Sequence, residues 1–414
     1  MCGTSPTSRC GRLYTSSVVH GELPSRAAGG TLNACRGANP RPGPSALIPD
    51  RTGSQSPETV AGQALKLTRT ADMTSLQAPD TSHGSDFAEL SRLIKEAGLL
   101  RRRRRYYAVR IGLNLAAFGG GWVAFAYLGD SWWQLFLAAF FAMVFAQLSF
   151  IGHDAGHKQI FRSRKANDAT GLFHGGLTGL SYGWWIGTHA RHHANPNNED
   201  EDPDVDIAAL AFSKAQSSRK RGFLRWVAKY QAFLFFPLLL LEGLNLHVSS
   251  VKAVWRGDVR QHKLESALLI AHLAAYLAAV FIVLSPLTGI IFILVHQFLW
   301  GLYMGCSFAP NHKGMEMLAS GHKLDFLRKQ VLTSRNIRGG PIVDFSLGGL
   351  NYQIEHHLFP SMARPNLKHA QVIVRDFCVR HEISYAECGW ARSYGYVLQH
   401  LHSVSAPLRT KVTP

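Results

Sequence analysis

Four long apolar segments dominate the pattern of hydrophobic and polar positions along the chain. They cover residues 107–128, 132–152, 265–285 and 287–309. A helix of roughly 20 apolar residues is long enough to cross the hydrocarbon core of a bilayer. Only residues 129–131 separate the first two segments, and the last two meet at a proline-containing turn. The pattern therefore predicts two transmembrane helical hairpins, with four spans in all.

Basic residues lie on one side of both predicted hairpins. Neither turn contains Lys or Arg, whereas an arginine run at 101–105 precedes the first hairpin and a basic region at 214–263 precedes the second. Lys and Arg collect in the cytoplasmic loops of membrane proteins. We therefore expect the ends of both hairpins, and both chain termini, on the cytoplasmic side. Because the formal charge of +17 lies largely beside apolar segments, nucleic acid is not an expected partner.

Three further segments have a clear pattern but do not suit a membrane crossing. Residues 87–100 predict a short amphipathic helix that leads into the arginine run. Residues 171–187 are apolar but rich in glycine and too short to cross easily, so we expect a buried or interfacial segment. Residues 232–246 form a short apolar run that contains Pro237 and Glu242 and has basic flanks, which favours a position in the membrane interface.

The rest of the pattern divides the chain into three parts. Residues 1–85 are rich in Ser, Thr, Gly, Pro and Arg without apolar periodicity, which predicts disorder. The same composition fits a transit-peptide leader, or translation that begins at Met73. Residues 86–395 would form the membrane domain and residues 396–414 a C-terminal tail. The six cysteines include no CxxC pair, which predicts neither a disulfide framework nor a thiolate metal site.

Three histidine clusters lie next to these apolar segments. They are HDAGH at 153–157, HARHH at 189–193 and QIEHH at 353–357. Side chains three or four residues apart share one side of a helix, so the imidazoles within each cluster face the same way. With 232–246 in the interface, an even number of crossings separates the clusters. We therefore predict an all-α integral membrane protein whose cytosolic helical cap brings the clusters together.

The clusters contain enough imidazoles for a site with two metal ions. Neutral imidazole binds Zn, Cu, Fe and Ni, and seven such groups are too many for one ion. Two histidine-bound metals with open positions favour O2 activation at iron, because zinc hydrolases usually add a carboxylate ligand and a base. Histidines on polar helix faces are the alternative, but ionisable residues at membrane edges are costly and tend to be functional. The candidate ligands are His153, His157, His189, His192, His193, His356 and His357.

These clusters, in this order and between these spans, resemble the three histidine boxes of the membrane fatty acid desaturases. The resemblance covers roughly residues 107–390, and the string GGLNYQIEHHLFPSM at 348–362 is similar to the third box of the front-end and related acyl-lipid desaturases. It implies O2-dependent insertion of a cis double bond into a fatty acyl chain. It also implies a non-haem di-iron centre held by the seven histidines, with His312, near the end of the last span, as an eighth ligand.

The resemblance further implies partners. The substrate would be a fatty acyl lipid, an acyl-CoA or an acyl carrier protein conjugate. Front-end desaturases of eukaryotes usually contain a cytochrome b5 domain with a His-Pro-Gly-Gly motif, which this sequence lacks. We therefore expect electrons from a separate ferredoxin or cytochrome b5-type donor that docks on the basic cytosolic face. Gln353 replaces a histidine found in other relatives, and three roles are open to it: a weak ligand, a hydrogen-bond partner of a ligand, or neither.

Four carboxylates near the boxes are candidates for holding ligand histidines in one orientation. A carboxylate that accepts the second N–H of a metal-bound imidazole fixes its tautomer. Asp202 and Asp204 belong to the acidic loop after the second box, and Asp154 and Glu355 lie inside the first and third boxes. A solvated, charged loop is the alternative for the first two.

Other aromatic residues and histidines have weaker signals. Four aromatic residues are candidates for a substrate tunnel, although membrane-belt or core packing is the alternative for them: Trp184, Trp185, Trp300 and Tyr303. The lone histidines His174, His296 and His322 are assigned to packing or to the surface.

Two other functions remain compatible with parts of the pattern. An integral-membrane hydroxylase or ketolase shares the histidine boxes but transfers oxygen to carbon. A membrane metal transporter would need ligands at the middle of the membrane and breaks inside its spans. The clusters here lie at the ends of the predicted spans, and the span interiors contain almost only His296.

Overall fold

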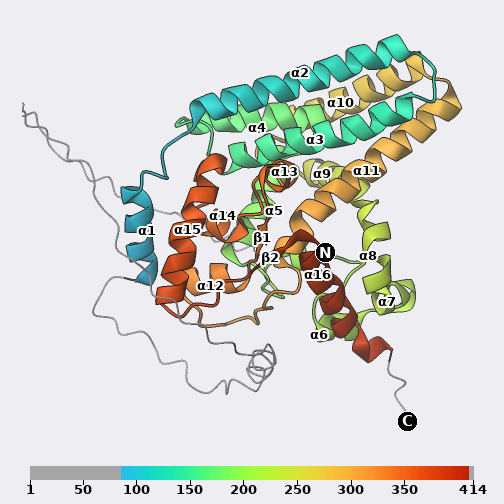
Figure 1. The fold of residues 1–414 in the computed structure, drawn as a ribbon. Helices are drawn as coiled ribbons and strands as arrows, with labels where there is room; N and C mark the ends of the chain where they lie inside the picture. Colours follow the sequence, from blue (N-terminus) through green and yellow to red (C-terminus); the bar gives the residue numbers. More distant parts are fainter. Residues whose placement is uncertain (1–84, 410–414) are drawn as a thin grey trace, which may run out of the picture. The chain divides into compact units, whose positions relative to one another are not determined.

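The computed structural model describes residues 85–409, which fold into α-helices with one small sheet (Figure 1). The expectations for the N-terminal 84 residues, namely disorder, a leader or a later start, lie outside the described residues. The helix predicted at 87–100 is present as α1 (Asp86–Glu96). Leu90 and Ile94 of its apolar face are fully buried in a cluster with residues of α12 (Phe326–Leu332) and α15 (Arg364–Arg380).

The four predicted spans are confirmed as helices that are long and apolar enough to cross a membrane. They are α2 (Arg104–Leu128), α3 (Gln134–Gly156), α10 (His262–Val283) and α11 (Pro286–His312). The four differ in burial: 17% of the apolar window is buried in α2 and α10, against 56% in α3. α3 is therefore the central helix, and α2 and α10 offer most of their surface to lipid.

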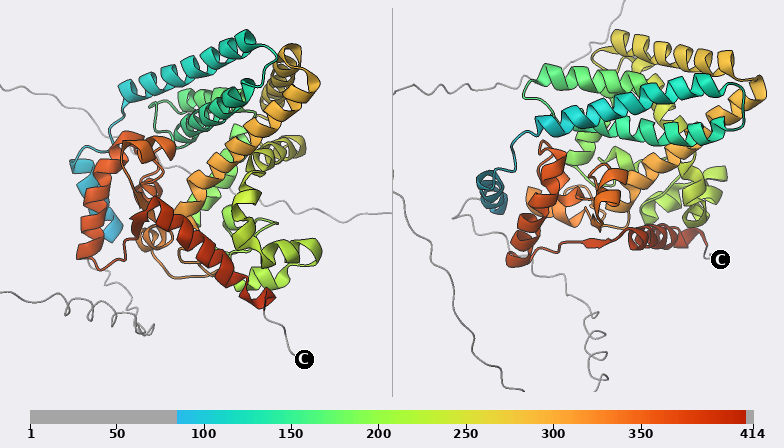
Figure 2. Two further views of the ribbon diagram at one scale, coloured as in Figure 1. Left: turned by 45° about the vertical axis from the view of Figure 1, so that its right-hand side comes forward. Right: turned by 45° about the horizontal axis from the view of Figure 1, so that its top comes forward.

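The packing of the spans positions the ends of α3 and α11. α2 packs on α3, α11 also packs on α3, and α10 packs mainly on α4 (Arg164–Thr178) and α9 (Glu242–Arg256). Figures 1 and 2 show α2, α3, α4 and α10 in one layer, with α11 running out of that layer towards the C-terminal helices. An aromatic cluster that includes Phe141 and Phe145 of α3 and Phe292 of α11 fills the space between the spans.

Neither of the two apolar runs that were not expected to cross the membrane forms a single long helix. The run at 171–187 is divided between α4 and α5 (Tyr182–Ala194), which meet at Gly179 in the left-handed conformation (φ 70°). The run at 232–246 is divided between α8 (Gln231–Leu239) and α9, which meet at an angle of 70°. If this bent pair is taken as one broken span, the described residues contain five candidate spans rather than four.

The C-terminal part adds short helices around a two-stranded sheet. β1 (Asn336–Arg338) and β2 (Glu387–Gly389) pair in parallel, with Ile337 opposite Cys388. The helices of this part are α12 (Phe326–Leu332), α13 (Pro341–Ser346), α14 (Gln353–Leu358), α15 (Arg364–Arg380) and α16 (Trp390–Val404). Two short helices, α6 (Lys214–Arg219) and α7 (Gly222–Lys229), precede α8.

α16 continues through the region expected to be a tail from residue 396 onwards. Val397 and Leu401 are fully buried in a cluster with Phe235 and Leu239 of α8. They lie four residues apart and therefore share one face of the helix. The apolar positions of this segment are thus the packing face of a helix, and the helix ends only at Val404.

The crossing of α9 over α11 depends on two glycines. A Cβ atom on Gly301 would lie 2.5 Å from the backbone nitrogen of Gly243 and 2.9 Å from the carbonyl oxygen of Leu239. Backbone atoms cannot yield as a flexible side chain can. Small residues at such crossings let membrane helices approach closely.

We expect Gly301→Ala to separate α11 from the α8–α9 pair and to destabilise the protein by about 1–3 kcal/mol, the usual cost of overpacking. Gly120→Ala in α2 is the matched control, because no atom lies within 4 Å of its added Cβ. Thermal unfolding of both purified variants in the same detergent tests this. Equal melting temperatures would show that the close crossing is not required.

Candidate metal centre

The eight candidate ligand histidines converge from four helices. His153 lies in the last turn of α3 and His157 caps it, His189, His192 and His193 lie on α5, His312 ends α11, and His356 and His357 lie on α14. Two groups have ring nitrogens that all lie within 4.8 Å of one another. The first group is His153, His157, His189 and His356, and the second is His192, His312 and His357.

His193 lies between the two groups. Its Nε2 is 3.1 Å from Nε2 of His189 in the first group. Its ring stacks on the ring of His357 in the second group, with centroids 4.1 Å apart. The HARHH spacing therefore presents all three imidazoles of α5 to one site, as the helical periodicity predicts.

Local structure explains how α5 reaches this position. Ser181 caps the helix by accepting a hydrogen bond from the backbone N–H of Trp184. Trp185 stacks on His189 at 4.4 Å and lies directly over Gly156 of α3, where any side chain would collide with the indole. The glycine of the HDAGH box therefore allows α5 to pack against the end of α3.

In the second group, each imidazole is held through Nδ1 by an oxygen that can only accept a hydrogen bond. Nδ1 of His192 lies 3.0 Å from both carboxylate oxygens of Asp202. Nδ1 of His312 lies 3.0 Å from the carbonyl oxygen of Thr333. The proton must then be on Nδ1, which leaves the Nε2 lone pair free to bind a metal. The Nε2 atoms of His192 and His312 face each other at 3.3 Å.

The side chain of Gln330 holds His357 in the same way. Its amide nitrogen donates to the carbonyl oxygen of His193 at 2.9 Å, so its Oε1 faces Nδ1 of His357 at 2.8 Å. Nε2 of His357 is buried and has no hydrogen-bond partner among the described residues. Gln330 thus orients one histidine and also fixes the end of α5.

Asp202 is the best-connected carboxylate of the site. Besides His192, it accepts hydrogen bonds from the backbone N–H groups of Asn197 at 2.8 Å and Asp204 at 2.9 Å. Burial opposes its ionisation, but the hydrogen bond from His192, the charge of Lys313 and the backbone N–H of Asp204 together hold the pKa of Asp202 below its usual range. The carboxylate of Asp204 is half exposed and lies 3.5 Å from Nδ1 of His192.

The carboxylates inside the first and third boxes have different surroundings. Asp154 lies 3.4 Å from Nδ1 of His153 and forms a buried ion pair of 2.7 Å with Arg364. Glu355 faces away from the histidines and accepts hydrogen bonds from Asn336 at 2.7 Å and Tyr385 at 2.8 Å. Of the four carboxylate candidates, Glu355 is therefore the one that does not contact an imidazole.

The amide of Gln353 also reaches the centre. Its nitrogen lies 2.9 Å from Nε2 of His312, and its oxygen accepts a hydrogen bond from Asn311 at 3.2 Å. Nε2 of His312 is also the nitrogen that a metal would use, so this contact leaves all three roles open for Gln353.

The buried nitrogens fit a bound metal. Both ring nitrogens of His356, Nε2 of His153 and Nδ1 of His193 have no hydrogen-bond partner among the described residues. Buried polar atoms without partners are costly, and a cation would satisfy them. Burial, reinforced by neighbouring imidazoles, lowers the pKa of His189, His193 and His356 well below its ordinary value. These imidazoles are therefore neutral, which is the form that binds metal.

The four aromatic tunnel candidates lie in different environments. Trp185 contacts His189 and His153. Trp184 packs with Val259 and its neighbours on the other face of α5. Trp300 is fully buried near Phe145, and the hydroxyl of Tyr303 accepts a hydrogen bond from Gln147 at 3.1 Å. Trp185 is thus the only one of the four with a ring contact to a box histidine.

Two of the lone histidines have local hydrogen bonds away from the centre. Nδ1 of His174 bonds to the carbonyl oxygen of Thr170, and Nδ1 of His296 bonds to the hydroxyl of Tyr276. His322 lies outside both histidine groups and is partly exposed. Sequence reasoning missed Gln330, Thr333 and Arg364, because no motif spacing connects them to the boxes.

Comparisons with known proteins agree with the geometry. The fatty acid desaturase family matches residues 130–389, a range that contains all three boxes. The chain is 28% identical over 342 residues to the delta(6)-fatty-acid desaturase fat-3 of Caenorhabditis elegans, covering 78% of this chain and 76% of the relative. It is 30% identical to an acyl-lipid (9-3)-desaturase of Physcomitrium patens, covering 77% and 62%, and 30% identical to fatty acid desaturase 3 of Bos taurus, covering 72% and 68%.

We expect Asp202→Ala to weaken iron binding by about 10–100-fold, the usual effect of losing a carboxylate that orients a ligand histidine. Without Asp202, the Nδ1 proton of His192 has no fixed acceptor and the Nε2 lone pair is no longer held towards His312. Elemental analysis of purified protein over a series of iron concentrations measures the change. Glu201→Ala is the control, because this exposed side chain of the same loop contacts no box histidine in residues 85–409.

Proposed function

The chain belongs to the fatty acid desaturase family, and from this premise we propose that it inserts a cis double bond into a fatty acyl chain in an O2-dependent reaction. It is an oxidoreductase, like the relatives named above. Formation of the double bond removes two hydrogen atoms from adjacent methylene groups. With two further electrons and two protons, O2 is reduced to two molecules of water. The observation that carries the proposal is the convergence of eight buried or partly buried histidines on one centre.

We assign two iron ions to these histidines. One ion would be held by the group around His153 and His157, the other by the group around His192 and His312, with His193 between them. When bound, the iron ions supply the redox chemistry that activates O2. The donor set suits this metal, because it consists of imidazoles and contains no thiolate.

The protein itself orients the ligands. Asp202, Thr333 and Gln330 hold three imidazoles so that their Nε2 atoms face inwards. Removal of hydrogen from an unactivated methylene requires that the acyl chain be held with one carbon at the centre. The apolar spans provide a surface for such a chain. We place Trp185 beside the reacting part of the chain, because its ring stacks on His189.

The proposed reaction also needs a source of electrons. We propose a ferredoxin or cytochrome b5-type donor, and a cytoplasmic position for the histidine boxes and both termini. The support is the distribution of basic residues at 101–105 and 214–263, which lie at the box ends of the predicted hairpins.

Expression in a host that lacks the activity, followed by lipid extraction and mapping of double bonds by mass spectrometry, tests the reaction. We expect a new cis alkene in a fatty acyl chain. A new alcohol or ketone at the same carbons would assign a hydroxylase or ketolase and overturn the desaturase proposal. Purified protein that holds zinc and consumes no O2 with a reductant present would exclude both enzymes and leave the metal transporter.

Substitution of a proposed iron ligand and substitution of the neighbouring amide Gln353 should have different effects. We expect His192→Ala to abolish iron binding and alkene formation, because His192 contacts both His312 and Asp202. Gln353→Ala should reduce iron binding and alkene formation without abolishing them, because the Gln353 amide contacts only one of the proposed ligands, His312. Iron content and alkene yield are measured in the same preparations.

His369→Ala is the matched control for these variants. This exposed histidine lies on α15 and belongs to neither histidine group. It should keep full iron content and activity. Equal iron content in His192→Ala and the unmodified protein would contradict the assignment of the centre.

A further inference from the structure

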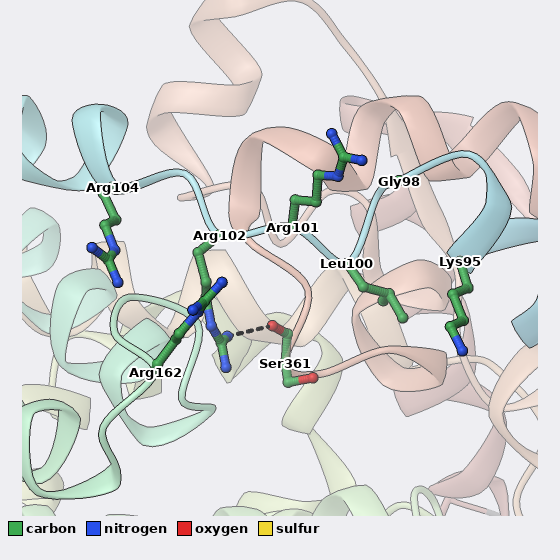
Figure 3. Close-up of a pocket in the computed structure, with 8 residues that line it drawn as sticks. All are labelled: Lys95, Gly98, Leu100, Arg101, Arg102, Arg104, Arg162 and Ser361. Atoms are coloured by element: carbon green, nitrogen blue, oxygen red, sulfur yellow. Dashed lines mark hydrogen bonds between the residues drawn. The ribbon is translucent and has the colours of Figure 1, made fainter. Parts of the chain in front are cut away.

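A basic pocket lies where the chain enters the first span. It has a volume of about 780 Å³ (Figure 3). Its lining comes from the end of α1, the α1–α2 connection, the start of α2, the loop after α3 and the loop after α14. Five of the lining residues are cationic, and no acidic residue is among them. The cations are Lys95, Arg101, Arg102, Arg104 and Arg162.

The charges in this pocket are not balanced by the described part of the chain. Among residues 85–409, no carboxylate lies within ion-pair distance of Arg102, Arg104 or Arg162. Within the described residues, the only acceptor bound by Arg102 is the carbonyl oxygen of Ser361, at 3.1 Å. Burial of the Arg102 guanidinium, with a further contribution from the positive charge of Arg162, lowers its pKa. An anion between these side chains would relieve their repulsion.

The side chains are arranged so that one anion can contact several of them. In Figure 3 the side chains of Arg102 and Arg162 reach towards each other from opposite directions, and the charge of Arg162 acts on Arg102. The side chain of Arg104 points to the same side of the α1–α2 connection as that of Arg102. The side chain of Arg101 points away from these three. A guanidinium group can donate two parallel N–H hydrogen bonds to one phosphate group. Phosphate is therefore an anion that suits these arginines.

The start of α2 adds to the preference for an anion. The helix begins at Arg104, has no side-chain cap and has no acidic residue in its first turn. A helix N-terminus carries partial positive charge, so basic residues are unfavourable there and an anion is favourable. The positive charges of the arginines therefore repel one another and the partial positive charge at the start of α2. An anion in the pocket would offset both repulsions.

The position of the pocket indicates the source of the anion. α2 is a candidate membrane span, so its first residues lie at the level of the lipid headgroups. Leu100, which also lines the pocket, is 43% exposed and offers an apolar contact beside the cations. A phospholipid combines a phosphate group with an adjoining apolar part, and its phosphate lies at this level.

We propose that this pocket binds the phosphate group of a membrane phospholipid through Arg102, Arg104 and Arg162. The site is separate from the metal centre, and binding there requires neither iron nor O2.

Lipid binding by the full-length protein tests the proposal. The probe is dioleoyl phosphatidic acid, and dioleoylglycerol is the comparison lipid because it has the same acyl chains without the phosphate. Native mass spectrometry of the detergent-purified protein gives the two affinities. We expect the phosphate-bearing lipid to bind at least about tenfold more tightly, since each cation near a phosphate contributes a several-fold gain. Equal affinities for the two lipids would overturn the proposal.

Two double variants localise the effect. R104Q/R162Q should lose most of the preference for phosphatidic acid, and neither side chain has a partner among the described residues whose loss would prevent folding. R375Q/R380Q removes two exposed arginines of α15 outside the pocket and should keep the preference. If R104Q/R162Q unfolds, the single variant R162Q carries the test. An unchanged preference in either pocket variant would show that the pocket is not the site.

Two further measurements distinguish other anions. Inorganic phosphate at the concentration of the lipid should not displace phosphatidic acid, and displacement would assign the pocket to a soluble phosphate compound. Cytochrome b5 is the acidic protein probe. Loss of its binding in R104Q/R162Q, with lipid binding retained, would make the pocket a protein docking site and contradict the lipid assignment. Because none of these readouts uses activity, they stand or fall independently of the proposed desaturation.

Discussion

The orientation of the buried imidazoles is the constraint on which the rest of the structure depends. A metal ligand must present a lone pair, and a neutral imidazole has one only on the nitrogen without a proton. In the group formed by His192, His312 and His357, three acceptors determine which nitrogen that is: a carboxylate, a backbone carbonyl and an amide oxygen. Without these acceptors, the same histidines would be free to rotate or to exchange tautomers.

This constraint explains why the centre is assembled at helix ends. His157 and His312 lie at the ends of α3 and α11, and these two helices pack on each other through the aromatic cluster between the spans. The apolar packing of α3 against α11 therefore brings the ligand histidines at the ends of these two helices close together. α5 and α14 then add their histidines from short helices that need not cross the membrane. Four helices contribute to the site, and each is held mainly by contacts outside it.

Much of this arrangement could be predicted from the sequence, because it depends on local periodicity. The spans follow from runs of apolar residues, and the common face of the HARHH imidazoles follows from the helical repeat. The orienting groups could not be predicted, because they are single residues far away in the chain. Thr333 acts through its backbone carbonyl, which carries no sequence signal, and Gln330 is an ordinary polar position of α12. The direction of the Glu355 side chain could not be predicted either, because it depends on Asn336 and Tyr385, which lie in other parts of the chain.

The basic pocket and the metal centre share the same loops. The amide of Gln159, two residues after the first box, donates to the carbonyl oxygen of Pro360, three residues after the third box, at 2.8 Å. The hydroxyl of Tyr107, in the first turn of α2, donates to Gln159 and accepts from the backbone N–H of Arg364. Arg364 in turn pairs with Asp154 beside His153. A phosphate held by Arg102 and Arg162 would therefore brace the two loops that follow the boxes. The lipid surface and the buried histidines are connected through this short series of hydrogen bonds.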